Sequence, residues 1–182
     1  MKKGILTLTV ATLSSLMLLG CNSDSNNDTE TTDTTTGDTL ILTSNGMISS
    51  IDRAMPNKII SNLKVTGLQA GDELVGIDYR PKDSKLYAVG FMGNIYTLNP
   101  STGVATFVKK LIAEPTDTTD GNAAFSTILG DANLITVNFN PVADRLRVIT
   151  NTGQNLRINV DTGATITDGA INLAAGSATV VA

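Results

Sequence analysis

The order of apolar and polar residues divides the chain into three parts. Residues 4–19 are mostly apolar, with only Thr and Ser as polar side chains, and residues 22–38 contain no apolar residue at all. From Thr39 onward, short runs rich in Ile, Val, Leu, Thr and Tyr are interrupted every few residues by Gly, Asn, Asp or Pro. This pattern is typical of antiparallel strands joined by tight turns. The sequence therefore predicts an all-β domain over residues 39–182, preceded by two segments of other kinds.

The β-rich part contains an internal repeat. The stretch that begins LVGIDYRP at Leu74 aligns without a gap to the stretch that begins LITVNFNP at Leu134, a spacing of 60 residues. A hairpin around each repeated glycine, Gly93 and Gly153, places apolar residues opposite apolar residues in both copies. The facing pairs predicted by this register are Leu86 with Leu98, Ala88 with Tyr96, Val89 with Ile95, Leu146 with Ile158 and Val148 with Leu156.

Each copy then holds four strands, which in the first copy are LVGIDY, KLYAV, NIYTLN and VATFV, with Asn99–Gly103 and Asn159–Gly163 as turns. A third, degenerate copy of the hairpin is expected around Asn45 and Gly46. Antiparallel four-stranded units repeated at a fixed period resemble the blades of a β-propeller. Residues 39–182 hold about two and a half periods, whereas propellers usually close with at least four blades. Either the chain is a fragment, or several chains complete a ring, or the units pack as an open stack or sandwich with an exposed edge. The uncharged, β-prone ending AAGSATVVA favours a fragment, so we expect an incomplete propeller that is truncated at its C-terminal end.

The apolar segment near the N-terminus predicts export. Lys2 and Lys3 precede it, and it is short for a membrane span, which needs about 20 apolar residues. The residues Leu18-Leu19-Gly20-Cys21 resemble the lipobox of bacterial prolipoproteins. This resemblance implies that residues 1–20 are a lipoprotein signal peptide and that Cys21 is the lipid attachment site, whose acyl chains anchor the protein in a membrane.

Asn22 follows the cysteine, and the enterobacterial sorting rule then implies the outer membrane of the bacterial cell envelope. The alternative is that Cys21 is a thiol near an ordinary cleavage site. Residues 21–38 are predicted to be a disordered polar tether, because they cannot bury enough apolar surface to offset the entropy of ordering. Asp24, Asn26 and Asp28 are spaced as in a calcium loop, but the loop's glycine and terminal glutamate are missing, which favours a solvated linker.

Composition narrows the available chemistry. The 182 residues include no histidine, which excludes a Ser-His-Asp triad, a Cys-His dyad and a His-ligated zinc ion. Lys and Arg number 13 against 17 Asp and Glu, and removal of residues 1–20, with two lysines and no acid, leaves 11 against 17. Such an acidic chain predicts no binding to nucleic acid. We expect no cofactor, with calcium as the one candidate ion.

The second repeat carries the strongest candidate for a binding site. The predicted register places Arg147 directly across from Arg157, with Arg145 on the same face, and like charges opposite each other on adjacent strands are unfavourable. We therefore expect an anion near these three residues, either a bound phosphate, carboxylate or acidic sugar, or the side chain of Asp144 or Asp161.

Asp78 and Asn138 occupy equivalent positions on the first strand of each repeat, where a propeller would line its central channel. They are candidates for binding a cation, and the alternative is that they bind backbone groups of turns. Asp117, Asp120 and Gly121 belong to the insertion between the repeats, where a solvated loop is favoured over a metal site.

Several stretches resemble a known family. VGIDYRP, LYAVG, GNIYTLNPSTGVAT and above all NFNPVADRLRVITNTGQNLRINVDTGA are similar to the bacterial domain-of-unknown-function family 4394, whose members are exported proteins with propeller-like repeats. The resemblance covers nearly all of residues 40–182. It implies a propeller-like fold and, because members generally continue further, a truncated chain. It implies no activity and no catalytic residues.

Two classes of function are compatible with these observations. The first is a non-enzymatic envelope module that binds a protein, glycan or peptide through its loops or edges. The alternative is an exported hydrolase or lactonase of the propeller type, which would use carboxylates and calcium. The chain has no tryptophan, which counts against the quinone-dependent dehydrogenase propellers, because their repeats resemble motifs built around tryptophan docking. No catalytic residue is predicted.

Overall fold

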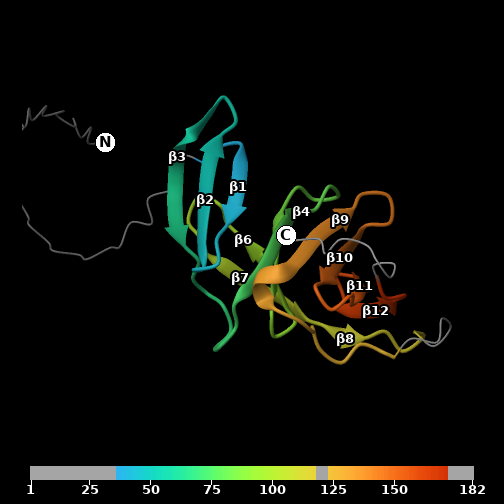
Figure 1. Ribbon diagram of the computed structural model, residues 1–182. Coiled ribbons are helices and arrows are strands. Elements are labelled where there is room, and N and C mark those ends of the chain that lie inside the picture. The colour runs from blue at the N-terminus through green and yellow to red at the C-terminus, as the bar shows by residue number, and fades with distance from the viewer. Residues whose placement is uncertain (1–35, 118–122, 172–182) are drawn as a thin grey trace, which may run out of the picture. The chain divides into compact units, whose positions relative to one another are not determined.

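The computed structural model describes residues 36–117 and 123–171, which form strands, turns and one short 3-10 helix (Figure 1). All of these described residues belong to one compact unit. The predicted signal peptide, Cys21 and residues 22–35 of the tether, including the calcium-like spacing at residues 24–28, lie outside this description. Within the described ranges no helix is long and apolar enough to cross a membrane.

The described strands form three sheets. The N-terminal sheet has the order β1-β2-β3, and its strands are β1 (Thr39–Leu42), β2 (Met47–Asp52) and β3 (Met55–Lys64). Repeat 1 is the sheet of β4 (Leu74–Tyr79), β5 (Leu86–Gly90), β6 (Asn94–Leu98) and β7 (Ala105–Lys110), in that order. Repeat 2 comprises β9 (Ile135–Asn140), β10 (Arg145–Thr150), β11 (Asn155–Ile158) and β12 (Ala164–Asp168). The 3-10 helix η1 (Ala132–Leu134) precedes β9, and β8 (Ile112–Ala113) adds to β12 in parallel.

This architecture confirms an all-β fold built from antiparallel four-stranded repeat units. The register predicted for the two hairpins is confirmed as well, since the observed pairs include Ala88 with Tyr96, Val89 with Ile95, Leu146 with Ile158 and Val148 with Leu156. The turn glycines Gly93 and Gly153 have φ angles of 78° and 82°. Glycine populates this left-handed region without the steric cost that other residues incur, so it can close each hairpin in the register that pairs the apolar faces.

The N-terminal sheet confirms the hairpin expected around Gly46. Gly46 closes the turn between β1 and β2 with a φ angle of 73°, and its carbonyl accepts the N–H of Val65 at 3.0 Å. The same contact recurs in repeat 1 and repeat 2, where the equivalent turn carbonyls accept the N–H groups of Leu111 and Ile171 at 2.8 and 2.9 Å. The N-terminal sheet is therefore a third copy that contributes three described strands. Its ordered part includes residues 36–38 of the predicted tether, because Gly37 donates its N–H to Ser50 Oγ at 3.0 Å.

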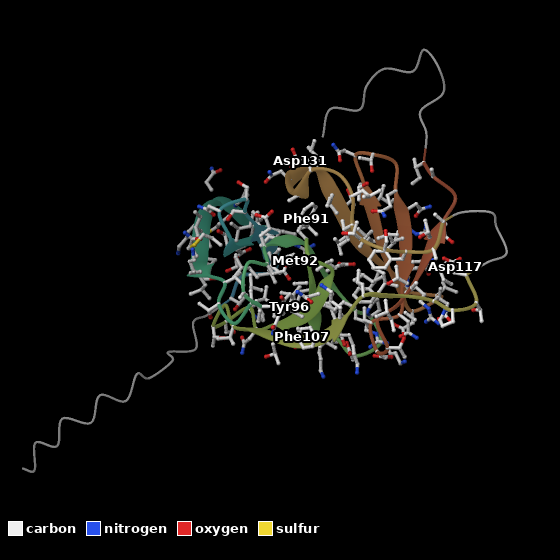
Figure 2. All side chains as sticks on the ribbon, turned by 90° about the horizontal axis from the view of Figure 1, so that it is seen from below. Phe91, Met92, Tyr96, Phe107, Asp117 and Asp131 are labelled. Atoms are coloured by element: carbon white, nitrogen blue, oxygen red, sulfur yellow. The ribbon has the colours of Figure 1, made fainter. Side chains whose placement is uncertain are left out.

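Two apolar clusters hold the three sheets together. One lies between the N-terminal sheet and repeat 1 and contains Ile48, Ala88 and Tyr96. The ring of Tyr96 packs edge to face against that of Phe107, with the two ring centroids 6.2 Å apart (Figure 2). The other lies between the two repeats and contains residues such as Val89, Phe139, Leu146, Val148 and Leu156. Every residue of β5 is buried, because repeat 1 has a sheet on each side.

Repeat 2 buries only one face in this way. Along β10, Leu146, Val148 and Thr150 are buried, whereas Arg145, Arg147 and Ile149 are half-buried. We call this second face, which also bears Asn155 and Arg157 on β11, the open face of repeat 2. It carries the residues that the sequence marks as candidates for anion binding.

Candidate anion-binding site

The open face of repeat 2 holds two arginines directly opposite each other. Arg147 on β10 is the partner of Arg157 on β11, as the repeat register predicts. On its other side Arg147 is the partner of Asn138 on β9, and Arg157 is followed across the sheet by Ile166 on β12. Because directly opposed residues of antiparallel strands point to the same face, these four side chains form one row that crosses the strands. We call it the arginine row.

One carboxylate serves both guanidinium groups. Asp168 on β12 accepts a hydrogen bond from Arg147 Nη2 at 3.2 Å, and it accepts two from Arg157, from Nε at 3.2 Å and from Nη2 at 2.7 Å. Arg147 also donates to the side-chain oxygen of Asn155, whose amide donates to the carbonyl of Gly169. The arginine side chains are 37% and 42% exposed. The two opposed guanidinium groups thus bind the same carboxylate at a surface that solvent reaches.

The third candidate, Arg145, lies at the start of β10 on the same face. Its Nη1 donates to the carbonyls of Ala143 and Asp144 at 3.3 and 3.0 Å, so its guanidinium lies against the turn that precedes the strand. The structure therefore brings two of the three predicted arginines together and places the third two residues along the same strand. Whether any of them binds an external anion stays a prediction.

The expectation that Asp144 or Asp161 neutralises the arginine pair is wrong. Both carboxylates bind Arg80, the residue that follows β4. Arg80 donates to Asp144 through Nε and Nη2 at 2.7 and 2.6 Å, and to Asp161 through Nη1 and Nη2 at 2.7 and 2.8 Å. The reason is that the side chains of these acids, which stand in two turns of repeat 2, meet Arg80 of repeat 1.

This Arg80 cluster joins the two repeats. The Arg80 side chain is only 4% exposed, and its Nη1 lies 3.5 Å from Asp83 in addition to the two acids of repeat 2. Lys82 Nζ contributes a further contact to Asp144 at 3.1 Å. Hydrogen bonds from Arg80 lower the pKa of Asp144 and Asp161, which keeps both acids ionised. Two cations face three carboxylates here, so the cluster has no surplus positive charge.

Sequence reasoning missed Arg80, and no local pattern could have identified it. It stands before Pro81 in a turn whose counterpart in repeat 2 carries Asn140, so the repeat does not mark it. Its partners lie 64 and 81 residues further along the chain.

The cation-binding candidates Asp78 and Asn138 lie on β4 and β9. Both carboxylate oxygens of Asp78 accept backbone N–H groups, from Tyr79 at 2.9 Å and from Phe139 at 2.7 Å. Asn138 is exposed beside Arg147 in the arginine row. In the parts of the chain that the structure describes, no three His, Cys, Asp or Glu side chains gather as they would to hold a metal ion. Cation binding by this pair stays a prediction.

Asp117 differs from the expected solvated loop residue. Its side chain is buried and accepts the N–H of Thr167 on β12 at 2.8 Å, so it ties the start of the insertion to repeat 2 (Figure 2). Asp120 and Gly121 lie outside the described residues.

Two surface hollows lie near the arginine pair, and the first of them is lined by Arg147 itself. One, of about 340 Å³, is lined by Arg147, Ile149 and polar side chains of β9, among them Thr136 and Asn138. The other, of about 320 Å³, is lined by Asn155, Asp168 and the segment around Phe125. A ligand larger than a single ion therefore has room beside Arg147, next to amide and hydroxyl groups that can bind neutral oxygens.

Comparison with known proteins identifies a family and no activity. Neither a search of curated proteins nor a search of solved structures found a significant match to this chain. The family described as Domain of unknown function (DUF4394) matches residues 47–182, a span that begins with β2 and includes both repeats. The matched span covers most of the chain, so the protein belongs to the DUF4394 family.

Proposed function

We propose that this protein is a bacterial envelope lipoprotein whose β-repeat domain binds an anionic partner through the open face of repeat 2. The anchoring part rests on the sequence: an apolar segment, the residues Leu18–Cys21 and an entirely polar stretch at 22–38. The four-stranded antiparallel repeats support their interpretation as blades of an incomplete propeller. In this proposal the domain acts as a binding module at the membrane surface.

The observation that carries the binding proposal is the contrast between two arginine clusters. Arg80 is buried and faces more negative than positive charge, as expected of a structural ion pair. Arg147 and Arg157 are more than a third exposed, and both bind Asp168. Guanidinium groups bind carboxylate and phosphate oxygens in charge-assisted, often bidentate hydrogen bonds. An external oxyanion that bound both would relieve the repulsion between these two directly opposed arginines.

Binding is tested by titrating the full chain, purified in detergent, with galacturonate and with inorganic phosphate, using calorimetry. Arg157→Gln is expected to weaken binding about tenfold, because a hydrogen bond to a charged group contributes about 1.5 kcal/mol or more. The matched control is Arg53→Gln, which makes the same charge change on an exposed arginine of the N-terminal sheet. Equal weakening in both variants would show that only the overall charge matters, and would contradict a site on repeat 2.

The anchor is tested separately by membrane fractionation and intact-mass analysis. The wild-type chain is expected to lack residues 1–20, to carry acyl mass on Cys21 and to sediment with membranes. The Cys21→Ser chain is expected to carry no acyl mass. An unmodified, freely soluble wild-type chain would refute the anchoring part and leave the binding part intact.

The enzyme alternative, an exported hydrolase or lactonase with calcium, stays a prediction without a specific arrangement to favour it. A large increase in Tm on adding calcium would favour this alternative, because a ligand that binds only the folded state stabilises the folded protein.

A further inference from the structure

The hairpin that joins β2 to β3 ends in a group of exposed residues. Ile51 pairs with Ile59 and Asp52 pairs with Met55, so residues 56–58 of β3 lie between two successive ladder pairs without partners on β2. Every residue from Met55 to Ile59 is exposed. We call the stretch from Asp52 to Ile59 the hairpin tip. None of these described residues belongs to the two apolar clusters that hold the sheets together.

The hairpin tip combines large apolar side chains with a cationic one. Met55 is 50% exposed and Ile59 is 60% exposed. Lys58 stands between them, is exposed, and makes no hydrogen bond or ion pair with the described part of the chain. A lysine can bury its apolar stem while its ammonium stays in a polar layer. This combination suits the boundary between the headgroups and the acyl chains of a lipid bilayer.

An added β-strand is a poor partner for the hairpin tip. β3 is an edge strand of its sheet, and an exposed edge can pair with a strand of another chain. Pro56 has no backbone N–H to donate, and Lys58 places a charge on the edge. Both features discourage the addition of a strand. The hairpin tip is therefore suited to contacts through its side chains.

The chain enters the domain beside the hairpin tip. Asp38, which precedes β1, accepts hydrogen bonds from the backbone N–H and from Nε of Arg53, both at 3.0 Å. Gly37 donates its N–H to Oγ of Ser50, near the end of β2. Cys21, the predicted lipid attachment site, precedes Asp38 by 17 residues. Such a segment spans at most about 60 Å when fully extended. A chain anchored at Cys21 therefore keeps the hairpin tip within reach of the membrane surface.

Resting on the anchoring part of the proposed function, we infer that the hairpin tip docks on the membrane to which Cys21 is attached. Met55 and Ile59 insert among the lipid acyl chains, and the ammonium of Lys58 binds headgroup phosphates. A weak contact is sufficient, because the anchor makes docking intramolecular and so raises the effective concentration of the tip at the bilayer. The docked hairpin then fixes the orientation of the domain, with the N-terminal sheet against the membrane.

A tryptophan placed in the hairpin tip reports its surroundings, because the chain has no tryptophan of its own. The lipidated full chain is reconstituted into vesicles of phosphatidylethanolamine and phosphatidylglycerol whose acyl chains carry bromine, which quenches tryptophan fluorescence. Met55→Trp is expected to lose at least about half of its emission, because interfacial side chains reach about 5–10 Å into the acyl boundary.

The matched control is Met92→Trp. Met92 is 53% exposed, and it lies in the turn between β5 and β6. That turn corresponds to the turn of Gly46, which stands at the opposite end of β2 from the hairpin tip. Met92→Trp is therefore expected to lose little of its emission in the same vesicles.

A second substitution on the Met55→Trp background tests the apolar contact. Ile59→Asn is expected to reduce the quenching by at least about half, because burial of an isoleucine side chain is a large part of a contact of this size. Leu129→Asn, which changes a residue of the second repeat region that is 49% exposed, should leave the quenching unchanged. Lys58→Glu should reduce the quenching as well, and most at low salt. Circular dichroism verifies that each variant is folded.

The outcomes separate this inference from the anchoring on which it rests. Equal quenching of Met55→Trp and Met92→Trp, in chains that float with the vesicles in a density gradient, would overturn the inference and leave the anchoring in place. Chains that do not float with the vesicles would refute the anchoring and the inference together. A blue shift of the Met55→Trp emission that grows with protein concentration in the absence of vesicles would assign the hairpin tip to a contact between copies of the chain, and would also overturn the inference.

Discussion

Arg80→Met tests whether the Arg80 cluster holds the two repeats together. Methionine has a similar length and can fill the same space, so the variant removes the charge and the hydrogen bonds with little loss of volume. Arg80 donates four hydrogen bonds to Asp144 and Asp161. Breaking a buried ion pair by removing one partner costs about 3–5 kcal/mol. Asp161 is 54% exposed and regains water, so we place the loss at about 2–3 kcal/mol.

The assay is thermal unfolding of the full chain in detergent by circular dichroism. The expected loss corresponds to a decrease in Tm of about 10 °C for a domain of this size. The matched control is Arg53→Met, which removes an arginine that is 78% exposed and contacts Asp38 at 3.0 Å, and we expect no measurable change in Tm. If Arg80→Met lowers Tm no more than Arg53→Met does, the reasoning about the buried cluster is refuted.

The pH dependence supplies a second readout. Arg80 lowers the pKa of Asp144 and Asp161 in the folded state, while in the unfolded chain an aspartate has a pKa of about 3.9. A carboxyl group whose pKa is lowered by folding stabilises the fold above its unfolded pKa, and this stabilisation is lost as the pH falls through the folded pKa. The difference in Tm between wild type and Arg80→Met should therefore have its full value near pH 7 and become smaller below about pH 4.

Three further changes test other parts of the structure. Asp168→Asn removes the acid that the two arginines share, so it should lower Tm and strengthen galacturonate binding several-fold; weaker binding in calorimetry would contradict the competition between Asp168 and ligand. Asp78→Ala leaves the N–H of Phe139 without its acceptor and should cost about 1–3 kcal/mol in urea unfolding, whereas Asp78→Asn should retain most of that stability. Gly163→Ala would place a Cβ atom 2.2 Å from a backbone carbonyl, and Gly46→Ala meets nothing within 4 Å, although both glycines have positive φ. We expect about 1 kcal/mol of loss for Gly46→Ala and a clearly larger one for Gly163→Ala, and equal losses would disprove the close approach.

The local features of this fold could be predicted because they depend on neighbours in sequence. In each hairpin the alternation of apolar and polar residues allows one register that buries a single side, and a one-residue shift would turn every side chain to the other face. Gly93 and Gly153 mark where the chain must take a left-handed conformation. These two constraints alone predict that Arg147 lies opposite Arg157, and the two residues are partners in the structure.

The partners of charged residues could not be predicted in the same way. The acid that binds Arg147 and Arg157 is Asp168 on the next strand, and the expected acids, Asp144 and Asp161, bind Arg80 instead. Asp117, expected in a solvated loop, is buried against β12. An ion pair depends on which turns and faces meet in space, and a repeat pattern does not contain that information.

The strands of the two repeats, their pairing and the equivalence of the repeats follow from the amino-acid pattern, because hydrogen-bonded pairing along a hairpin is a local consequence of period-two patterning and turn chemistry. Which faces of the sheets are covered depends on how the sheets pack against one another. The central strands of repeat 1 lie between two sheets and are buried on both sides, whereas repeat 2 is covered on one side only and its arginines are half-exposed. Burial is set by contacts between sheets distant in sequence, so the distinction between a structural arginine at position 80 and candidate ligand-binding arginines at 147 and 157 exists only in three dimensions.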